Sequence, residues 1–188
     1  MQKAKSSRKE KITKNIDMYD SVSASINGQI LLIKGPKGEV NREIKQRNIS
    51  IRIDNKKIIL ESKSGKKEDK KTIGSLVAHI KNMVKGSSQS HVYTLKICSG
   101  HFPMNVSVSN NKFVVKNFLG EKVPRVLYLK AGADVKIEGD LIYVASANKE
   151  IAGQVSADIE QLTRRPGYDT RVFQDGIYVV NKDGKELK

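Results

Sequence analysis

The sequence predicts an α+β protein made of two tandem duplicated domains, each an antiparallel β-sheet packed with one α-helix. The first observation is an internal repeat of about eighty residues, which is far longer than a solenoid unit and is typical of a duplicated small domain. The second is that each copy alternates apolar and polar residues in short runs and then continues into an apolar stripe of helical period. Three pairs of segments carry the repeat: 31–40 with 113–122, 51–62 with 135–146, and 74–80 with 153–159.

The strands of the first copy are predicted by short apolar runs and by the turns between them. Asn27-Gly28 separates two such runs, which is a strong hairpin signal. Residues 35–38 (Gly-Pro-Lys-Gly) predict a second turn; a phosphate-binding glycine loop would require a following helix and a Lys-Ser/Thr pair, and neither follows. Residues 49–53 alternate as a half-buried strand, and 54–57 turn it back into a strand over 58–60.

One helix is predicted near the end of each copy. In the first, Thr72 caps an apolar stripe over residues 73–84 and Gly86 ends the helix, after a polar loop over 62–71. In the second, Asn148 caps a stripe that begins at Ile151 and ends before Pro166-Gly167. The segment 168–180 has no counterpart in the first copy and predicts a turn and a last strand.

These elements predict four segments. They are a basic, flexible N-terminal extension (1–15), a first α+β domain (16–99), a second α+β domain that is the main candidate for nucleic-acid binding (100–180), and a basic C-terminal tail (181–188). A strand over 92–97 runs out of the first domain in this division.

Charge is the property that restricts the partners most. Lys and Arg total 35 against 20 Asp and Glu, which leaves a net charge of +15 and a pI near 9.8. Such a balance favours nucleic acid as the partner, ahead of an anionic membrane or an acidic protein, and the remaining alternative is a lysine-rich surface that serves solubility. The single cysteine, Cys98, excludes an internal disulfide, and no apolar run has the length of a membrane span. We therefore expect a soluble protein of a reducing compartment, with no leader peptide.

No catalytic or metal site is predicted, and no cofactor or small-molecule substrate is expected. The three histidines lack metal-ligand spacing. A hydrolase would need a nucleophile, a base and an orienting acid. Ser99, His101 and Glu121 offer these groups without any recognisable motif around them.

The basic residues of the second half gather at turns and strand ends, where loops at one end of a sheet can bring them together. Arginines among them can form a fork on two phosphate oxygens. Phe and Tyr total only 10, so stacking of bases on an open sheet is disfavoured, and we expect recognition of a folded RNA by its shape. The predicted RNA-binding residues are Lys122, Arg125, Arg164, Arg165, Arg171 and Lys182.

Four segments resemble a known family. They are 78–86 (AHIKNMVKG), 101–104 (HFPM), 117–122 (NFLGEK) and 171–178 (RVFQDGIY). Together they are similar to the universal large-subunit ribosomal protein six, in its archaeal and eukaryotic branch, over about residues 16–180. The family is a tandem duplication of a small α+β domain, in agreement with the repeat. Its members begin close to the first strand, so the lysine-rich N-terminal segment departs from the family.

The resemblance implies a structural component of the large ribosomal subunit in the cytoplasm. Its expected partners are ribosomal RNA near the sarcin-ricin loop and stalk base, neighbouring ribosomal proteins, and the translational GTPases that dock nearby. Lys122, Arg125 and Arg171 lie in or next to the matching segments, whereas Arg164, Arg165 and Lys182 are predicted from charge and position. The alternative function is a basic RNA-associated interaction or assembly protein outside the mature ribosome.

Overall fold

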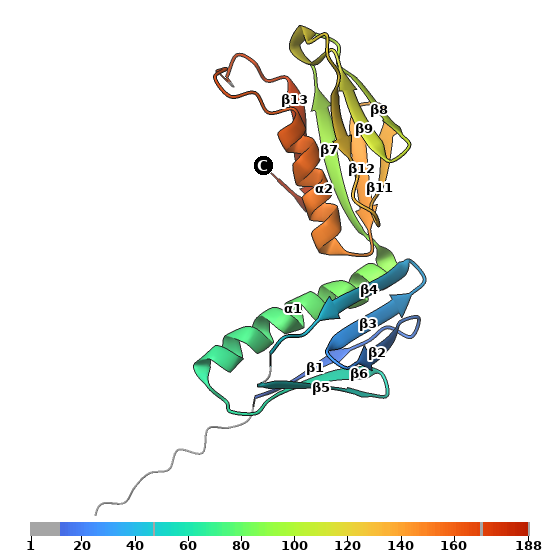
Figure 1. Cartoon of the computed structure of the whole chain (residues 1–188), viewed down its shortest axis with the longest axis vertical. Helices are drawn as coiled ribbons and strands as arrows, with labels where there is room; N and C mark the ends of the chain where they lie inside the picture. Colours follow the sequence, from blue (N-terminus) through green and yellow to red (C-terminus); the bar gives the residue numbers. More distant parts are fainter. Residues whose placement is uncertain (1–11, 47, 170, 188) are drawn as a thin grey trace, which may run out of the picture. The chain divides into compact units, whose positions relative to one another are not determined.

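The chain folds into two compact units, Met1–Ser88 and Gln89–Lys188 (Figure 1). The computed structural model describes residues 12–46, 48–169 and 171–187.

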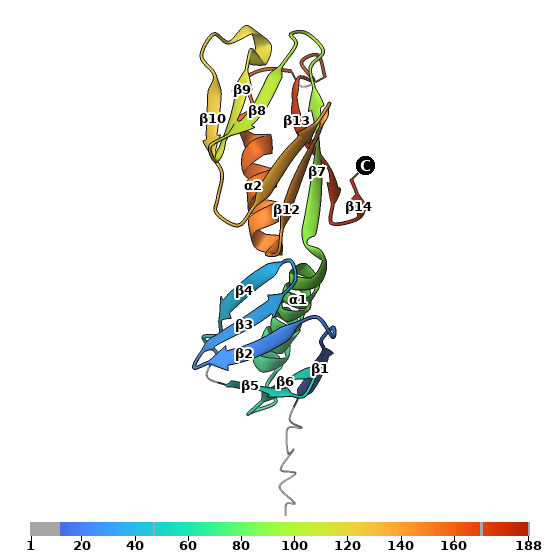
Figure 2. The same ribbon diagram turned by 90° about the vertical axis from the view of Figure 1, so that its right-hand side faces the viewer.

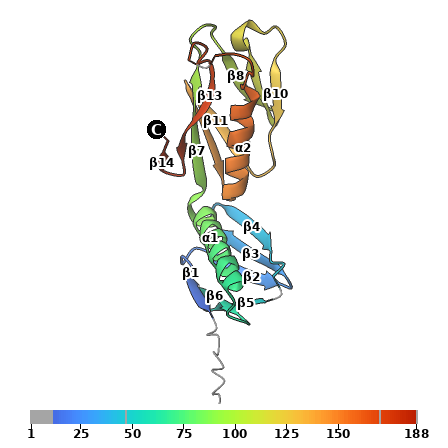
Figure 3. The same cartoon turned by 90° about the vertical axis from the view of Figure 1, so that its left-hand side faces the viewer.

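The first unit consists of two three-stranded antiparallel sheets and one helix. Its strand orders are β1-β6-β5 and β2-β3-β4. Among the described residues its elements are β1 (Thr13–Asp17), β2 (Ser23–Asn27), β3 (Ile30–Gly35), β4 (Gly38–Glu43), β5 (Ile49–Asp54), β6 (Lys57–Ser62) and α1 (Lys67–Gln89). Figure 3 shows α1 running alongside these strands.

The second unit repeats this plan with a larger sheet. Its strand orders are β10-β9-β8 and β11-β12-β7-β13-β14. Its helix α2 contacts β7, β12 and β13 of the larger sheet and β10 of the smaller one (Figure 2). The described elements are β7 (His91–Cys98), β8 (Asn105–Ser109), β9 (Lys112–Lys116), the 3-10 turn η1 (Phe118–Gly120), β10 (Arg125–Tyr128), β11 (Asp134–Glu138), β12 (Leu141–Ser146), α2 (Lys149–Leu162), β13 (Gly176–Lys182) and β14 (Lys185–Glu186).

The predicted duplication is confirmed by matched burial in the two units. β3 and β9 are both the middle strands of their sheets, and both bury every second residue. The pairs β5-β6 and β11-β12 likewise correspond, and each second strand buries three alternate side chains. Side chains along a strand alternate between two faces, so the alternate buried residues lie on one face. In each copy this apolar face is covered by the helix of the same copy. The cores are built mainly from Ile, Val and Leu, as the composition requires.

Two sequence patterns correctly predicted a hairpin turn and the start of a helix. The Asn27-Gly28 hairpin joins β2 and β3, with Gly28 at φ 63°. Asn148 caps α2, since its side chain accepts a hydrogen bond of 2.9 Å from the backbone N–H of Glu150. Both signals act between residues that are neighbours in sequence.

The predicted ends of the first helix were wrong at both termini. α1 begins at Lys67, so Thr72 lies inside the helix, where its hydroxyl donates to the Glu68 carbonyl. The helix also continues past Gly86 to Gln89. Near this end the Ser87 carbonyl accepts the backbone N–H of Lys37 from the turn between β3 and β4, so a tertiary contact holds the last turn of the helix.

The structure also corrects three predicted segment limits. β7 belongs to the second unit, where it pairs with β12 and β13, so the units divide at residue 88 rather than at 99. Residues 13–15 are part of β1 and pair with β6, whereas the rest of the predicted N-terminal extension, residues 1–11, lies outside the described residues. The predicted C-terminal tail is largely a hairpin of β13 and β14. The first two corrections reflect backbone pairing with strands that are distant in sequence, whereas the third is a local hairpin.

The two copies differ most at one hairpin. β3 and β4 are joined by the predicted tight turn, in which Ile33 pairs with Val40, seven residues later. In the second unit Val115 pairs with Arg125, ten residues later. The segment enclosed by these matched pairs is therefore three residues longer in the second unit, and the connection between the strand ends grows from residues 36–37 to residues 117–124, which contain η1. This longer loop carries Lys122 and precedes Arg125, so it supplies part of the predicted basic cluster.

Candidate nucleic-acid interface

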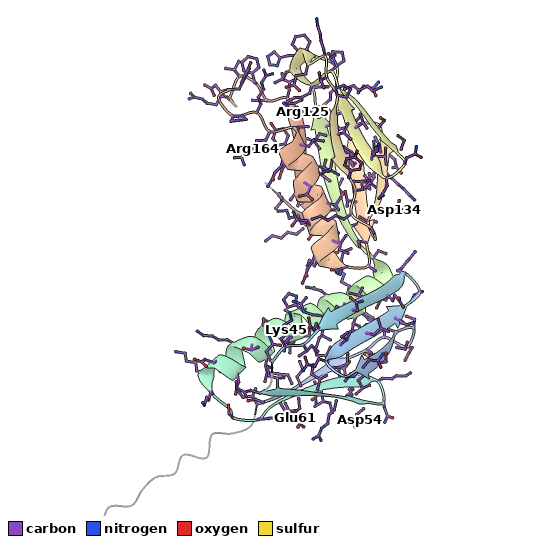
Figure 4. All side chains as sticks on the ribbon, in the orientation of Figure 1. Lys45, Asp54, Glu61, Arg125, Asp134 and Arg164 are labelled. Carbon is purple, nitrogen blue, oxygen red and sulfur yellow. The ribbon has the colours of Figure 1, made fainter. Side chains whose placement is uncertain are left out.

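Five of the six predicted cations come from three segments that meet at one end of the second unit. The backbone N–H of Ile177 donates to the Thr163 hydroxyl at 2.9 Å, which fixes the end of α2 beside the start of β13. Arg125 reaches the same helix end from the start of β10. The loop over 163–175 then connects α2 to β13. Figure 4 shows Arg125 and Arg164 near this end of α2.

Arg125 binds groups of its own unit. Its Nε and Nη2 donate to the two carboxylate oxygens of Glu121 at 2.8 and 2.6 Å. Its Nη1 donates to the Leu162 carbonyl at 2.6 Å and to the Arg164 carbonyl at 3.3 Å. The guanidinium also lies over the Phe118 ring, 4.3 Å from the centroid. Arg125 therefore ties the β9–β10 connection to the last turn of α2, where a cation is favoured by the free carbonyls.

Glu121 balances part of the positive charge of this cluster. The hydrogen bonds from Arg125 lower the pKa of the Glu121 carboxyl against the opposing effect of burial, and the charges of Arg125 and Arg165 lower it further. Arg165 lies 3.8 Å from the same carboxylate. Glu121 thus stays ionised, accepts the hydrogen bonds of Arg125 and forms an ion pair with Arg165.

The other predicted cations are more accessible. Arg171 is 89% exposed and holds Asp169 through a forked pair at 3.1 and 3.2 Å. Hydrogen bonds from Arg171 lower the pKa of Asp169. Lys122 and Arg164 are exposed, and their side chains make no contact with an acid among the described residues. These three side chains can meet a phosphate from solvent.

Lys182 does not join the cluster. It ends β13, whereas the cluster lies at the Gly176 end of that strand. Six residues of extended strand separate these two positions, which corresponds to about 20 Å. The sequence placed Lys182 close to the other cations only because it follows the last predicted strand.

A hollow of about 710 Å³ lies beside the basic residues. Its walls combine three kinds of side chain: the guanidinium groups of two arginines, three aromatic rings, and two carboxylates. The lining residues are Leu119, Glu160, Gln161, Thr163, Arg164, Arg165, Pro166, Gly167, Tyr168, Phe173, Asp175 and Tyr178.

The aromatic wall is a row of contacts that the sequence analysis missed. The Arg165 guanidinium lies 4.3 Å from the Tyr168 ring centroid. The Tyr168 ring meets Phe173 edge-on at 5.0 Å, and Phe173 lies 5.0 Å from the His101 ring. The low aromatic total concealed this group, but the alternation of arginines and aromatic residues over 164–178 was a signal that could have found it.

Asp175 anchors the end of the loop over 163–175 to His101. Its carboxylate accepts the backbone N–H of His101 at 2.9 Å and contacts the His101 ring nitrogen Nδ1. Burial raises the pKa of Asp175, but the hydrogen bonds and charge from His101, with a further bond from the Gly100 backbone, outweigh burial and lower it. His101 is therefore held against Asp175, and Glu121 is held by Arg125, so these groups are not arranged as a catalytic set with Ser99.

In the described part of the chain, His, Cys, Asp and Glu side chains form no group of three or more that could hold a metal ion. Neither α1 nor α2, as described, has the length and apolar character of a membrane span.

The fold and this surface define a class of protein: a basic, duplicated α+β protein whose second copy presents arginines and aromatic rings at one end. A family model described as "Ribosomal protein L6" matches residues 20–90 and 102–176. Proteins described as "Large ribosomal subunit protein uL6" are similar over nearly the whole chain. That of Methanococcus vannielii is 41% identical over 176 residues, or 94% of this chain and 97% of the relative. That of Methanothrix thermoacetophila is 39% identical over 92% of this chain and 98% of the relative.

The chain belongs to the ribosomal protein L6 family. This membership confirms the family and the archaeal branch that the sequence motifs indicated, and with them the duplicated α+β fold class. The family is one of structural ribosomal proteins, so the prediction that the chain is not an enzyme is confirmed as well.

Proposed function

We propose that the chain is a structural component of the large subunit of the cytoplasmic ribosome and binds ribosomal RNA through the basic end of its second unit. The observation that supports this most directly is that Arg164 and Arg165 line one hollow, while Arg125 braces the segment after Lys122 against the end of α2 and Arg171 lies in the loop that follows α2. Accessible arginines and lysines on a rigid support suit a folded RNA, whose phosphates have fixed positions.

The structure suggests different roles for the predicted residues. Lys122, Arg164 and Arg171 contact phosphates, because their charged groups are exposed. Arg165 does so less fully, since it also faces Glu121 and Tyr168. Arg125 acts as a positioning residue, because four of its hydrogen bonds go to the protein. Lys182 contributes little to this interface, because it lies at the other end of β13.

We place the bound RNA near the sarcin-ricin loop and stalk base, where the chain supports the docking of translational GTPases. Neighbouring ribosomal proteins are the other partners in this assignment. Sucrose-gradient sedimentation tests the ribosomal part. The chain should travel with the large subunit at moderate salt, and recovery in the free fraction would support the alternative, an RNA-associated factor outside the mature ribosome.

Salt dependence tests the phosphate contacts. The double variant Arg164→Ala/Arg171→Ala should reduce the slope of log affinity for an isolated rRNA domain against log salt by about 1 to 2, because each lost phosphate contact releases about one counterion fewer. Lys182→Ala is the matched control and should leave the slope unchanged. An unchanged slope in the double variant, or an equal loss in the control, would contradict this assignment of the interface.

Factor docking needs a separate measurement. Large subunits that contain the double variant should support slower GTP hydrolysis by an elongation factor at subsaturating factor concentration. Subunits with Lys182→Ala should behave as wild type. Equal hydrolysis in all three preparations would remove factor docking from the proposed function while leaving RNA binding intact.

A further inference from the structure

The hollow beside α2 has a charge pattern that a site for phosphate alone does not need. Arg164 and Arg165 line it together with two acidic residues, Glu160 and Asp175. Burial raises the pKa of Tyr178, which also lines the hollow, and the two carboxylates raise it further. A phosphate is favoured beside the two arginines but disfavoured beside the two carboxylates, so the carboxylates call for a different group. The hollow therefore suits a group that donates hydrogen bonds.

The aromatic side chains suit a flat ligand. Tyr168 and Tyr178 are each 41% exposed, and both line the hollow. Tyr168 is held by Arg165 on one side and Phe173 on another. Tyr178 is held close to the backbone, since a Cβ at Gly176 would lie 3.1 Å from its hydroxyl oxygen. Rings that are already immobilised lose little freedom when a base stacks on them.

Glu160 supplies an available acceptor among these rings. Its Oε1 accepts the backbone N–H of Val179 at 3.1 Å, which orients the carboxylate. Its Oε2 accepts no hydrogen bond from the described residues. Both oxygens of Asp175, in contrast, already face His101. A ligand amino group in the hollow would therefore bind the Glu160 carboxylate.

We propose, resting on the proposed RNA-binding function, that this hollow is a site for one unpaired nucleotide of RNA. The base stacks on Tyr168 or Tyr178, its exocyclic amino group donates to Glu160, and its phosphate meets Arg164 and Arg165. The volume of about 710 Å³ lies within the usual range of small-ligand sites, about 300–1,000 Å³. Bases with an exocyclic amino group are accepted, and uracil is disfavoured because it presents a carbonyl oxygen to a carboxylate.

Cytosine and uracil form a matched pair for the test, because they have nearly the same size and uracil carries a carbonyl oxygen where cytosine carries the amino group; they also differ at the adjacent N3, which is why Glu160→Gln is the deciding variant. Short single-stranded homopolymers of C and U are titrated into the full chain, with affinity measured by tyrosine fluorescence and the bound residues located by amide NMR shifts. Oligo(C) should bind about tenfold more tightly than oligo(U), since a hydrogen bond to a charged acceptor is at stake. Shifts should concentrate at Glu160, Tyr168 and Tyr178.

Variants separate this site from general RNA binding. Glu160→Gln keeps an acceptor for the Val179 N–H and adds a donor, so the C-to-U ratio should fall to about twofold or less while the amide spectrum stays native. Tyr168→Leu and Tyr178→Leu are compared, and the variant that removes the stacking ring should weaken both homopolymers about tenfold. Arg164→Ala should weaken both alike and leave their ratio unchanged.

Two results would overturn the nucleotide site. One is equal affinity of the wild-type chain for oligo(C) and oligo(U). The other is an unchanged C-to-U ratio in Glu160→Gln. Either result together with normal binding of the rRNA domain would leave the phosphate interface standing, whereas loss of binding to the rRNA domain itself would count against the proposed function.

Discussion

Replacement of Arg125 distinguishes a bracing residue from a phosphate ligand. Arg125→Ala removes a forked pair with Glu121 whose side chains are only 22% and 28% exposed, a bond of 2.6 Å to the carbonyl of Leu162, and a contact with the ring of Phe118. A partly exposed forked pair contributes about 1 kcal/mol, a charged bond to a carbonyl about 1.5 kcal/mol and the ring contact about 0.5 kcal/mol. In the variant, water forms part of the lost hydrogen bonds at the exposed end of the helix, so the net loss is smaller than the sum of these contributions. We expect a loss of about 2 kcal/mol, or a melting temperature about 10 °C lower for a unit of this size.

The tyrosines make this loss measurable in the second unit. Five of the six lie there and the chain has no Trp, so near-ultraviolet circular dichroism reports mainly that unit. Arg125→Lys keeps the charge but not the fork, and should fall between wild type and Arg125→Ala. Lys122→Ala is the control, since Lys122 is exposed in the β9–β10 connection, and it should melt as wild type. Wild-type melting of Arg125→Ala, combined with a salt slope reduced by about 1, would refute the bracing role and identify Arg125 as a phosphate ligand.

Three further predictions concern the fold. Gly35→Ala should destabilise the first unit by about 1–3 kcal/mol, because its Cβ would lie 2.5 Å from the Ser87 carbonyl oxygen. Gly74→Ala is in an exposed helical position with nothing within 4 Å, and it should stabilise the unit by about 0.5–1 kcal/mol. Chemical denaturation measures both changes in unfolding free energy, and changes of the same sign would contradict the contact at Gly35. Asp175→Asn should lower the stability of the second unit near neutral pH by about 1–2 kcal/mol. A carboxyl whose pKa is lowered by folding stabilises the fold at pH values above its unfolded pKa, and this stabilisation is lost as the pH falls through its folded pKa. The stability difference between the variant and wild type should therefore shrink below about pH 4. A deficit that does not vary with pH would exclude the charge as its source. Asn148→Ala should destabilise the second unit by about 1 kcal/mol, because α2 loses its N-cap. Hydrogen exchange of the Glu150 amide should become faster in this variant, and an unchanged exchange rate would contradict the cap.

The sequence predicted well those features that depend on neighbouring residues. The hairpin at Asn27-Gly28 and the helix cap at Asn148 are decided within a few residues, and the structure contains both. The duplication was also readable, because matching strands need the same alternation to bury the same face. Thr72 shows the limit of this reasoning: it suits a helix cap, yet α1 already begins at Lys67.

The candidate site was predicted less completely, because its chemistry depends on contacts between distant segments. Arg125 has the charge of a phosphate ligand, but its partners include the Leu162 carbonyl, 37 residues away. The sequence analysis treated the few aromatic residues as evidence against base stacking, whereas the loop gathers Tyr168 and Phe173 around one hollow with Tyr178. Lys182 shows the opposite case, since a nearby position in sequence did not bring it to the cluster.

The sequence by itself determined the duplicated α+β plan, the basic character of the chain and the family, because repetition, alternation, charge and motifs are properties of order along the chain. Only the tertiary structure decided which unit contains β7, which cations remain free for a partner, and that arginines, tyrosines and a carboxylate share one hollow. The physical reason is that strand pairing, charge neutralisation and cavity shape arise between segments that are distant along the chain. Their energies depend on separations in space that no local pattern encodes.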